Sequence, residues 1–153
     1  MRLERGLFAC VLGVSIVLLA GCGAGATGGV KREDAATKRQ EAARVHTDLG
    51  HQYLNQGKLE LALEKLNKAL SFDPDYADAH TVIAVLYEKI GDTAKAEEHY
   101  RRAAQLKPKG GSELNNYAAF LCKLGRYDEA QAYFQLALTD PFYKTPAVAL
   151  VNS

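Results

Sequence analysis

Small, apolar and turn-forming residues recur every 34 positions from about Ala43 onward. The recurring sets are Gly57, Gly91 and Gly125; Ala62, Ala96 and Ala130; Ala69, Ala103 and Ala137; and Pro74 and Pro108. Sets that keep one register through several units indicate a repeat protein, in which each unit is one supersecondary element. Glycine where a first helix stops and proline where a second one ends predict a helix-turn-helix unit.

The order of residue types within each unit resembles the tetratricopeptide repeat (TPR), which has the same period. In every unit a large residue is followed by a small one, a tyrosine or leucine, glycine, alanine, a large apolar residue and a second alanine. We therefore expect an all-α TPR solenoid, in which stacked helix pairs bury a continuous core. The expected units are residues 36–76 with a lead-in before Ala43, residues 77–110, residues 111–145, and the beginning of a further repeat at 146–153.

Two features of each unit predict how its helices meet. Small residues, such as Gly50 in the first helix and Ala62 in the second, allow the two helices to approach closely. The repeated glycine, Gly57 in the first unit, stands where a left-handed residue costs glycine nothing. After Pro74, Asp75 is expected to accept hydrogen bonds from the first amides of the next helix, as an N-cap does.

The N-terminus carries an apolar run after two arginines. Residues 6–20 are 15 positions without a charge, which suits a signal peptide and is shorter than the ~20 residues of a transmembrane helix. Leu19-Ala20-Gly21-Cys22 resembles the bacterial lipobox. We expect residues 1–21 to be a lipoprotein signal peptide and Cys22 to be lipidated, with palmitate among its acyl chains. The alternative, an uncleaved signal anchor, must include residues 21–30, whose glycines favour irregular backbone.

Composition agrees with an exported protein that lacks disulfides. Cys10 leaves with the leader and Cys22 takes the lipid, so Cys122 has no second cysteine for an intramolecular bridge. The chain has 19 basic and 18 acidic residues, so we expect no nucleic-acid partner. Residues 22–35 are expected to hold the lipidated cysteine and a flexible linker, with a helix beginning near Ala36.

Residues suited to catalysis are few. His46 and His80 occupy equivalent repeat positions, where packing explains both, and Cys122 has no histidine partner in register. The sequence contains no HExxH or CxxC spacing, and its glycine-rich segments lack the Lys-Ser/Thr of a phosphate loop. We therefore expect no enzyme activity, no cofactor and no metal site.

The first helices of a TPR array line its concave side, where we expect a protein partner to bind. The stripe of side chains expected there is mixed and only mildly apolar, which suits an extended or helical peptide segment. It consists of Thr47, His51, Leu54, Asn55, Thr81, Val85, Glu88, Lys89, Asn115, Ala119, Cys122 and Lys123. The alternative is that these residues form an ordinary solvated helix face.

The chain as a whole resembles the PilF/PilW family of TPR lipoproteins. The likeness rests on the lipobox, the charged lead-in from Lys31 to Arg44, residues 111–130 with their Asn-Asn-Tyr and Cys, and residues 143–147. It implies an outer-membrane lipoprotein, lipid-anchored through Cys22 at the periplasmic face, that acts as a pilotin in type IV pilus biogenesis. Its expected partners are the secretin subunits, whose localisation and multimerisation it would assist. Gly23 agrees, since an aspartate at that position would favour the inner membrane.

A second function remains open on the residues alone. The chain is then a general periplasmic TPR adaptor lipoprotein that recruits peptidoglycan or outer-membrane assembly proteins. Members of the PilF/PilW family carry more repeats than the three expected here. We therefore expect the chain to be a fragment or a truncated product of a longer array.

Overall fold

The computed structural model describes residues 27–143. Three of the sequence expectations lie outside these residues: the signal peptide at 1–21, the lipidation of Cys22, and the further repeat at 146–153. They remain predictions.

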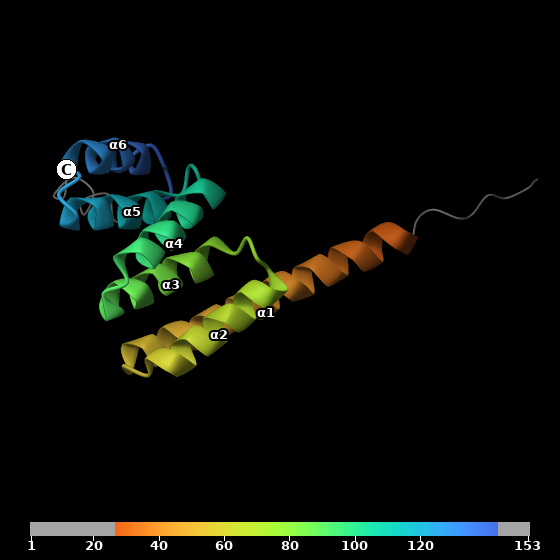
Figure 1. Ribbon diagram of the computed structural model, residues 1–153. Helices are drawn as coiled ribbons and strands as arrows, with labels where there is room; N and C mark the ends of the chain where they lie inside the picture. Colours follow the sequence, from red (N-terminus) through yellow and green to blue (C-terminus); the bar gives the residue numbers. More distant parts are fainter. Residues whose placement is uncertain (1–26, 144–153) are drawn as a thin grey trace, which may run out of the picture.

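Within residues 27–143, six α-helices form three antiparallel pairs that stack one after another (Figure 1). Their bounds are α1 Thr27–Asn55, α2 Leu59–Phe72, α3 Ala77–Ile90, α4 Thr93–Leu106, α5 Gly111–Lys123 and α6 Tyr127–Ala137. Within each pair the two helices pack along their length, and α3 contacts both α1 and α5. The expected all-α TPR solenoid is confirmed.

The turn inside each pair is made by the repeated glycine. Gly57, Gly91 and Gly125 have φ angles of 73°, 82° and 74°, in the left-handed region that side chains with a Cβ rarely adopt. In the turn at Gly91, the amide of Asp92 donates to the carbonyl of Tyr87 at 2.9 Å and so closes the end of α3. The predicted role of these glycines is confirmed.

The expectation for Asp75 is wrong. The N-cap residue of α3 is Tyr76, and no side chain caps the first amides of this helix. Tyr76 stands between Asp75 and the first helical residue, and the Asp75 carboxylate makes no hydrogen bond to those amides. It instead pairs with the guanidinium of Arg102 in α4.

Within the first pair, α1 and α2 approach each other at Gly50. A Cβ atom built on Gly50 would lie 2.6 Å from Cγ of Leu66 and 3.3 Å from the carbonyl oxygen of Ala62, both in α2. Leu66 is fully buried, so its side chain has no free space into which to move. The close approach predicted from small residues at these positions is therefore observed.

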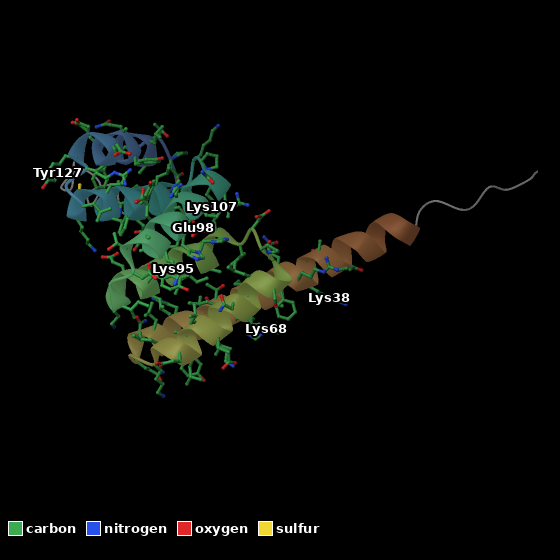
Figure 2. All side chains as sticks on the ribbon, viewed as in Figure 1. Lys38, Lys68, Lys95, Glu98, Lys107 and Tyr127 are labelled. Atoms are coloured by element: carbon green, nitrogen blue, oxygen red, sulfur yellow. The ribbon has the colours of Figure 1, made fainter. Side chains whose placement is uncertain are left out.

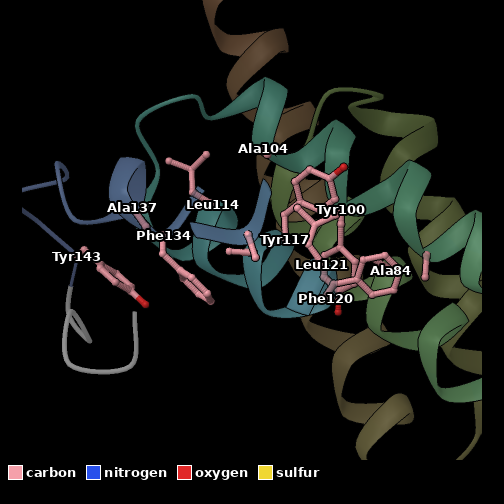
Figure 3. Packing of buried hydrophobic residues seen from close by; sticks show 13 residues of the cluster. Ala84, Tyr100, Ala104, Leu114, Tyr117, Phe120, Leu121, Phe134, Ala137 and Tyr143 are labelled. Carbon is pink, nitrogen blue, oxygen red and sulfur yellow. The ribbon is translucent and has the colours of Figure 1, made fainter. Parts of the chain in front are cut away.

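The apolar core continues from one helix pair to the next in two clusters. A smaller cluster joins the first two pairs and consists of Leu54, Ala62, Leu66, Ile83 and Leu86. A larger cluster joins the last two pairs (Figure 3), and in it the rings of Tyr100 and Phe120 lie with centroids 5.0 Å apart. No single pair could bury these side chains alone, as expected for a solenoid.

The chain after α6 folds back onto the beginning of α5. The carboxylate of Asp140 accepts a hydrogen bond from the amide of Gly111 at 2.8 Å, which serves one of the amides that open this helix. Tyr143 is buried against Gly111, and a Cβ on that glycine would lie 2.6 Å from the tyrosine. Figure 3 shows Tyr143 beside Ala137 at the edge of the larger cluster. The described chain therefore ends in a compact cap on the third pair.

The expected flexible linker at 22–35 needs correction, because α1 already begins at Thr27 rather than near Ala36. The first part of α1 projects beyond α2 (Figure 1), and residues 34–41 are exposed. Gln40 stands one full repeat period before Pro74, at the repeat position where proline ends the later second helices. Since glutamine can continue a helix, the lead-in and the first repeat helix form one continuous rod.

The length of α1 does not give it the character of a membrane span. None of the six described helices combines sufficient length with sufficient apolar character to cross a bilayer. The exposed surface of α1 carries charged residues instead, and Arg44 there pairs with Glu41 at 2.6 Å and with Asp48 at 3.2 Å.

The close approach at Gly50 gives a test of the fold. Gly50→Val should lower the free energy of unfolding by about 1–3 kcal/mol, because the added side chain must displace buried Leu66. Gln52→Val, at an exposed position two residues along α1, should change it by less than about 0.5 kcal/mol. Urea unfolding followed by circular dichroism measures both. Equal losses in the two variants would contradict the predicted close packing.

Candidate partner-binding groove

A groove of about 280 Å³ lies where the first helices of the three pairs meet. Its walls come from α1, α3 and α5, so it crosses both junctions between repeats. The lining residues are His51, Leu54, Asn55, Thr81, Val82, Val85, Lys89 and Asn116. Six of these eight belong to the stripe predicted from the sequence.

A second hollow of about 370 Å³ continues the groove toward the third repeat. It shares Val85 and Lys89 with the first hollow, and adds Glu88, Tyr100 and Lys123. Together the two hollows form one depression, which we call the concave groove. Eight of the twelve predicted stripe residues line it.

The floor of the concave groove is apolar and its edges are polar. Leu54 is almost fully buried, whereas Val85 keeps 39% of its surface exposed despite being apolar. Asn55 lies at the edge and approaches Nε2 of His51 at 3.4 Å, one helical turn away. Apolar floors with a few polar groups at their edges are typical of ligand and peptide sites.

One carboxylate in the groove is fully engaged. Glu88 accepts a hydrogen bond from the hydroxyl of Tyr100 at 2.9 Å and also pairs with the ammonium of Lys123. Burial raises the pKa of Tyr100 far above its ordinary value, and the adjacent negative charge of Glu88 raises it further. The phenol therefore stays protonated and keeps donating to Glu88. By contrast, Lys89 takes part in none of the ion pairs found within residues 27–143.

Further ion pairs hold the second and third repeats together behind this groove. Arg126 contacts Glu97 of the preceding repeat at 2.7 Å, and the partly buried Glu113 pairs with Lys107 at 2.7 Å. A charged pair of which one member is buried resists separation, because breaking it leaves an uncompensated charge. These two pairs therefore join α4 and its C-terminal end to the third repeat.

Four residues of the predicted stripe do not line the groove. Thr47 is buried and its hydroxyl donates to the carbonyl of Ala43 at 2.8 Å, inside α1. Asn115 is buried too, and Ala119 and Cys122 pack against the larger core cluster. The predicted stripe was wrong at these four positions, because their side chains are buried or packed against the core and do not line the groove.

Three residues that line the groove were absent from the predicted stripe. Val82 and Asn116 lie 34 residues apart and therefore occupy the same repeat position. Adding this repeat position to the predicted stripe would have identified both residues. Tyr100 comes from a second helix, α4, whereas the predicted stripe used first helices only. Its ring is buried in the core, and its hydroxyl reaches Glu88 in the groove.

The two histidines at equivalent repeat positions, His46 and His80, contact neighbouring residues of the fold. The ring of His46 stacks on Phe72 at 5.5 Å, and His80 is buried between two hydrogen-bond partners. Within the described part of the chain, no group of three or more metal-ligating side chains could hold an ion. Figure 2 shows the charged side chains of Lys95 and Glu98 on α4 and of Lys107 directly after it.

Helical repeats with a groove across their first helices define the TPR class of protein-binding scaffolds. Three family models match the chain: a TPR repeat model at residues 50–91, and tetratricopeptide repeat models at residues 77–109 and 114–139. Together the models match residues 50–109 and 114–139, which include most of the helix pairs that build the concave groove.

Comparison with known proteins narrows this class. An uncharacterised protein of Haemophilus influenzae is 34% identical over 123 residues, covering 80% of this chain and 69% of that protein. The type IV pilus assembly protein PilF of Pseudomonas aeruginosa is 38% identical over 105 residues, covering 69% of this chain and 42% of PilF. The chain belongs to the PilF/PilW-type family of TPR proteins.

Solved structures agree with this assignment. The structure of Pseudomonas aeruginosa PilF superposes with a TM-score of 0.72 at 36% identity, covering 75% of this chain and 52% of PilF. That of PilW, described as a widely conserved type IV pilus biogenesis factor, gives 0.69 at 36% identity, covering 72% and 50%. The chain therefore spans about half of each solved relative.

The Tyr100 hydroxyl can be tested by removing it alone. Tyr100→Phe should lower the free energy of unfolding by about 1–2 kcal/mol, because Glu88 loses a buried donor while the ring packing remains. Tyr127→Phe is the matched control, since Tyr127 is 69% exposed and should show almost no change. Thermal unfolding of both variants measures the difference, and a similar response from the two would show that the hydroxyl contributes nothing.

Proposed function

We propose that this protein is a protein-binding scaffold in type IV pilus biogenesis and that the concave groove is its binding site. The observation that carries the proposal is the groove itself, which crosses the repeat junctions of a chain 38% identical to PilF. The family resemblance supports the same role.

The groove suits an extended peptide segment with an apolar side chain and a neighbouring acidic one. Leu54, Val82 and Val85 offer the apolar floor, whose burial by a ligand contributes affinity. The amides of Asn55 and Asn116 have donors and acceptors for a peptide backbone. Lys89 supplies a positive charge at the edge for a carboxylate.

The partner that fits the family resemblance is the secretin of the type IV pilus. In this proposal the protein is an outer-membrane lipoprotein, anchored by lipid on Cys22 at the periplasmic face. It binds a segment of each secretin subunit and assists the subunits in reaching the outer membrane and forming multimers. The continuous rod formed by α1 then lies between the lipid anchor and the groove.

A charge placed in the groove tests this function. Val85→Asp should reduce secretin capture by the detergent-solubilised protein at least ~10-fold, because a carboxylate replaces an apolar contact in the floor. Ile90→Asp is the matched control: Ile90 is 51% exposed on the same helix and lies outside the groove lining, so capture should persist. SDS-resistant secretin multimers in cells should fall in parallel with capture.

Two outcomes would count against the proposal. If Val85→Asp and Ile90→Asp capture secretin equally well, the groove is not the binding site. If the wild-type protein retains peptidoglycan enzymes or outer-membrane assembly proteins and no secretin, the general periplasmic adaptor is the correct function.

The lipid anchor has its own test. Cells grown with labelled palmitate should incorporate label into the wild-type protein and not into Cys22→Ala, because the cysteine sulfur is the site of attachment. The substituted protein should also leave the outer-membrane fraction. Equal labelling of the two proteins would overturn the assignment of Cys22, and the groove experiment would still stand.

A further inference from the structure

Two histidines face each other between α3 and α4. Nδ1 of His80 lies 2.9 Å from Nδ1 of His99, and Nε2 of His80 lies 3.0 Å from the carbonyl oxygen of Pro74 in the α2–α3 loop. His80 is buried and His99 is half-buried. The pair therefore connects three pieces of the chain: the loop that joins the first two repeats, α3 and α4.

These contacts define which nitrogens carry protons. The Pro74 carbonyl can only accept, so Nε2 of His80 must be the donor. In the neutral ring Nδ1 of His80 is then a bare acceptor, and Nδ1–H of His99 donates to it. One proton between two Nδ1 atoms holds the pair together.

Adding protons to this pair has unequal effects. After the first proton binds, one ring is charged and the other still has a bare Nδ1, so the hydrogen bond survives. A second proton leaves two N–H groups facing each other 2.9 Å apart on two positive rings. That arrangement has no acceptor and is repulsive, so the contact must break.

Aromatic and charged side chains from α3, α4 and the α2–α3 loop surround the two histidines. Tyr87 of α3 stacks on His99 with ring centroids 5.8 Å apart. Glu98, Arg101 and Arg102 of α4 line the hollow beside the two histidines, and Arg102 pairs with Asp75 of the loop. The Glu98 carboxylate favours a charged His99, whereas burial and the neighbouring His80 oppose it and act in the direction that prevails.

We propose that His80 and His99 form a proton-operated latch that fastens α4 to α3 and to the α2–α3 loop, and that acid opens it. Burial of His99, together with the neighbouring His80, lowers the pKa of His99, which agrees with a pair that resists charging. Because His99 takes up its proton at a lower pH in the folded chain than in the unfolded one, stability falls as the pH drops below about 6.5.

Two sets of contacts connect the histidine pair to Glu88 in the concave groove. Tyr87, stacked on His99, precedes Glu88 in α3, and Tyr100 follows His99 in α4 and donates to Glu88. Release of α4 therefore loosens the Glu88 side of the groove. This consequence rests on the proposed function of the groove, whereas the latch itself does not.

Nitrogen NMR of the histidine rings in the full chain, solubilised in detergent and labelled with ¹⁵N-histidine, tests the latch directly. The chain has only four histidines, so every ring is observed. At pH 7.5 one ring of the pair should be the Nδ1–H tautomer and the other the Nε2–H tautomer. On acidification the two should titrate as a coupled pair. Two independent titrations, or matching tautomers, would overturn the proposal.

A melting-temperature series between pH 7.5 and pH 5.0 gives the second readout. His99→Phe keeps a ring beside Tyr87 and removes the imidazole that binds the proton. Between pH 7.5 and pH 5.0, the melting temperature of this variant should therefore fall by at least about 4 °C less than the melting temperature of the wild type. His46→Phe is the control, because His46 holds the same repeat position as His80 but stacks on Phe72. It should lose as much as the wild type.

The outcomes separate the latch from the function. Equal acid sensitivity in His99→Phe and the wild type would refute the latch, and if His99→Phe does not fold, the ring titration of the wild type decides. Secretin capture should weaken in acid for the wild type and less for His99→Phe. Failure of capture at every pH rejects the proposed function alone, since the ring titration needs no partner.

Discussion

The two helices of each repeat lie close together because small residues occupy the positions where they meet. At Gly50 the side chain of Leu66 fills the space that a Cβ would need, and Ala84 and Ala118 are fully buried at the corresponding places in the later repeats. A small residue on one helix leaves room for a large one on its partner, and the large side chains also reach the next pair, so the buried clusters cross the junctions between pairs. The shared clusters that result set the spacing of α1, α3 and α5, and therefore the width of the groove.

The groove contains one carboxylate that is paired inside the protein, Glu88, and one lysine outside the ion pairs of residues 27–143, Lys89. Glu88 is held by Tyr100 and Lys123, so its negative charge is compensated inside the protein. Lys89, the next residue, points its charge to the edge of the same depression. A ligand that carries a carboxylate beside an apolar side chain therefore finds attraction at the edge without having to displace an internal ion pair.

The repeat period made the class of fold, the helix pairs and the turn glycines predictable, because each repeat position has one dominant physical role. Most residues of the groove were predictable as well, because the first helices of all repeats line the same concave side. Contacts outside the register did not follow: the Asp140 carboxylate reaches Gly111, and the Tyr100 hydroxyl enters the groove from a second helix. Asp75 failed as a cap because one intervening residue moved its carboxylate toward Arg102. Such contacts depend on tertiary geometry, which a periodic pattern does not contain.

The glutamine at position 40 has a geometric consequence. A helix that passes through this point without a break turns by about 100° and advances by about 1.5 Å with every residue. The angular phase between the groove and the N-terminal end of α1 is therefore fixed by the number of residues in the rod. A single-residue insertion or deletion there would keep the contacts of the residues that follow Gln40 and would still point the groove in a different direction relative to that end.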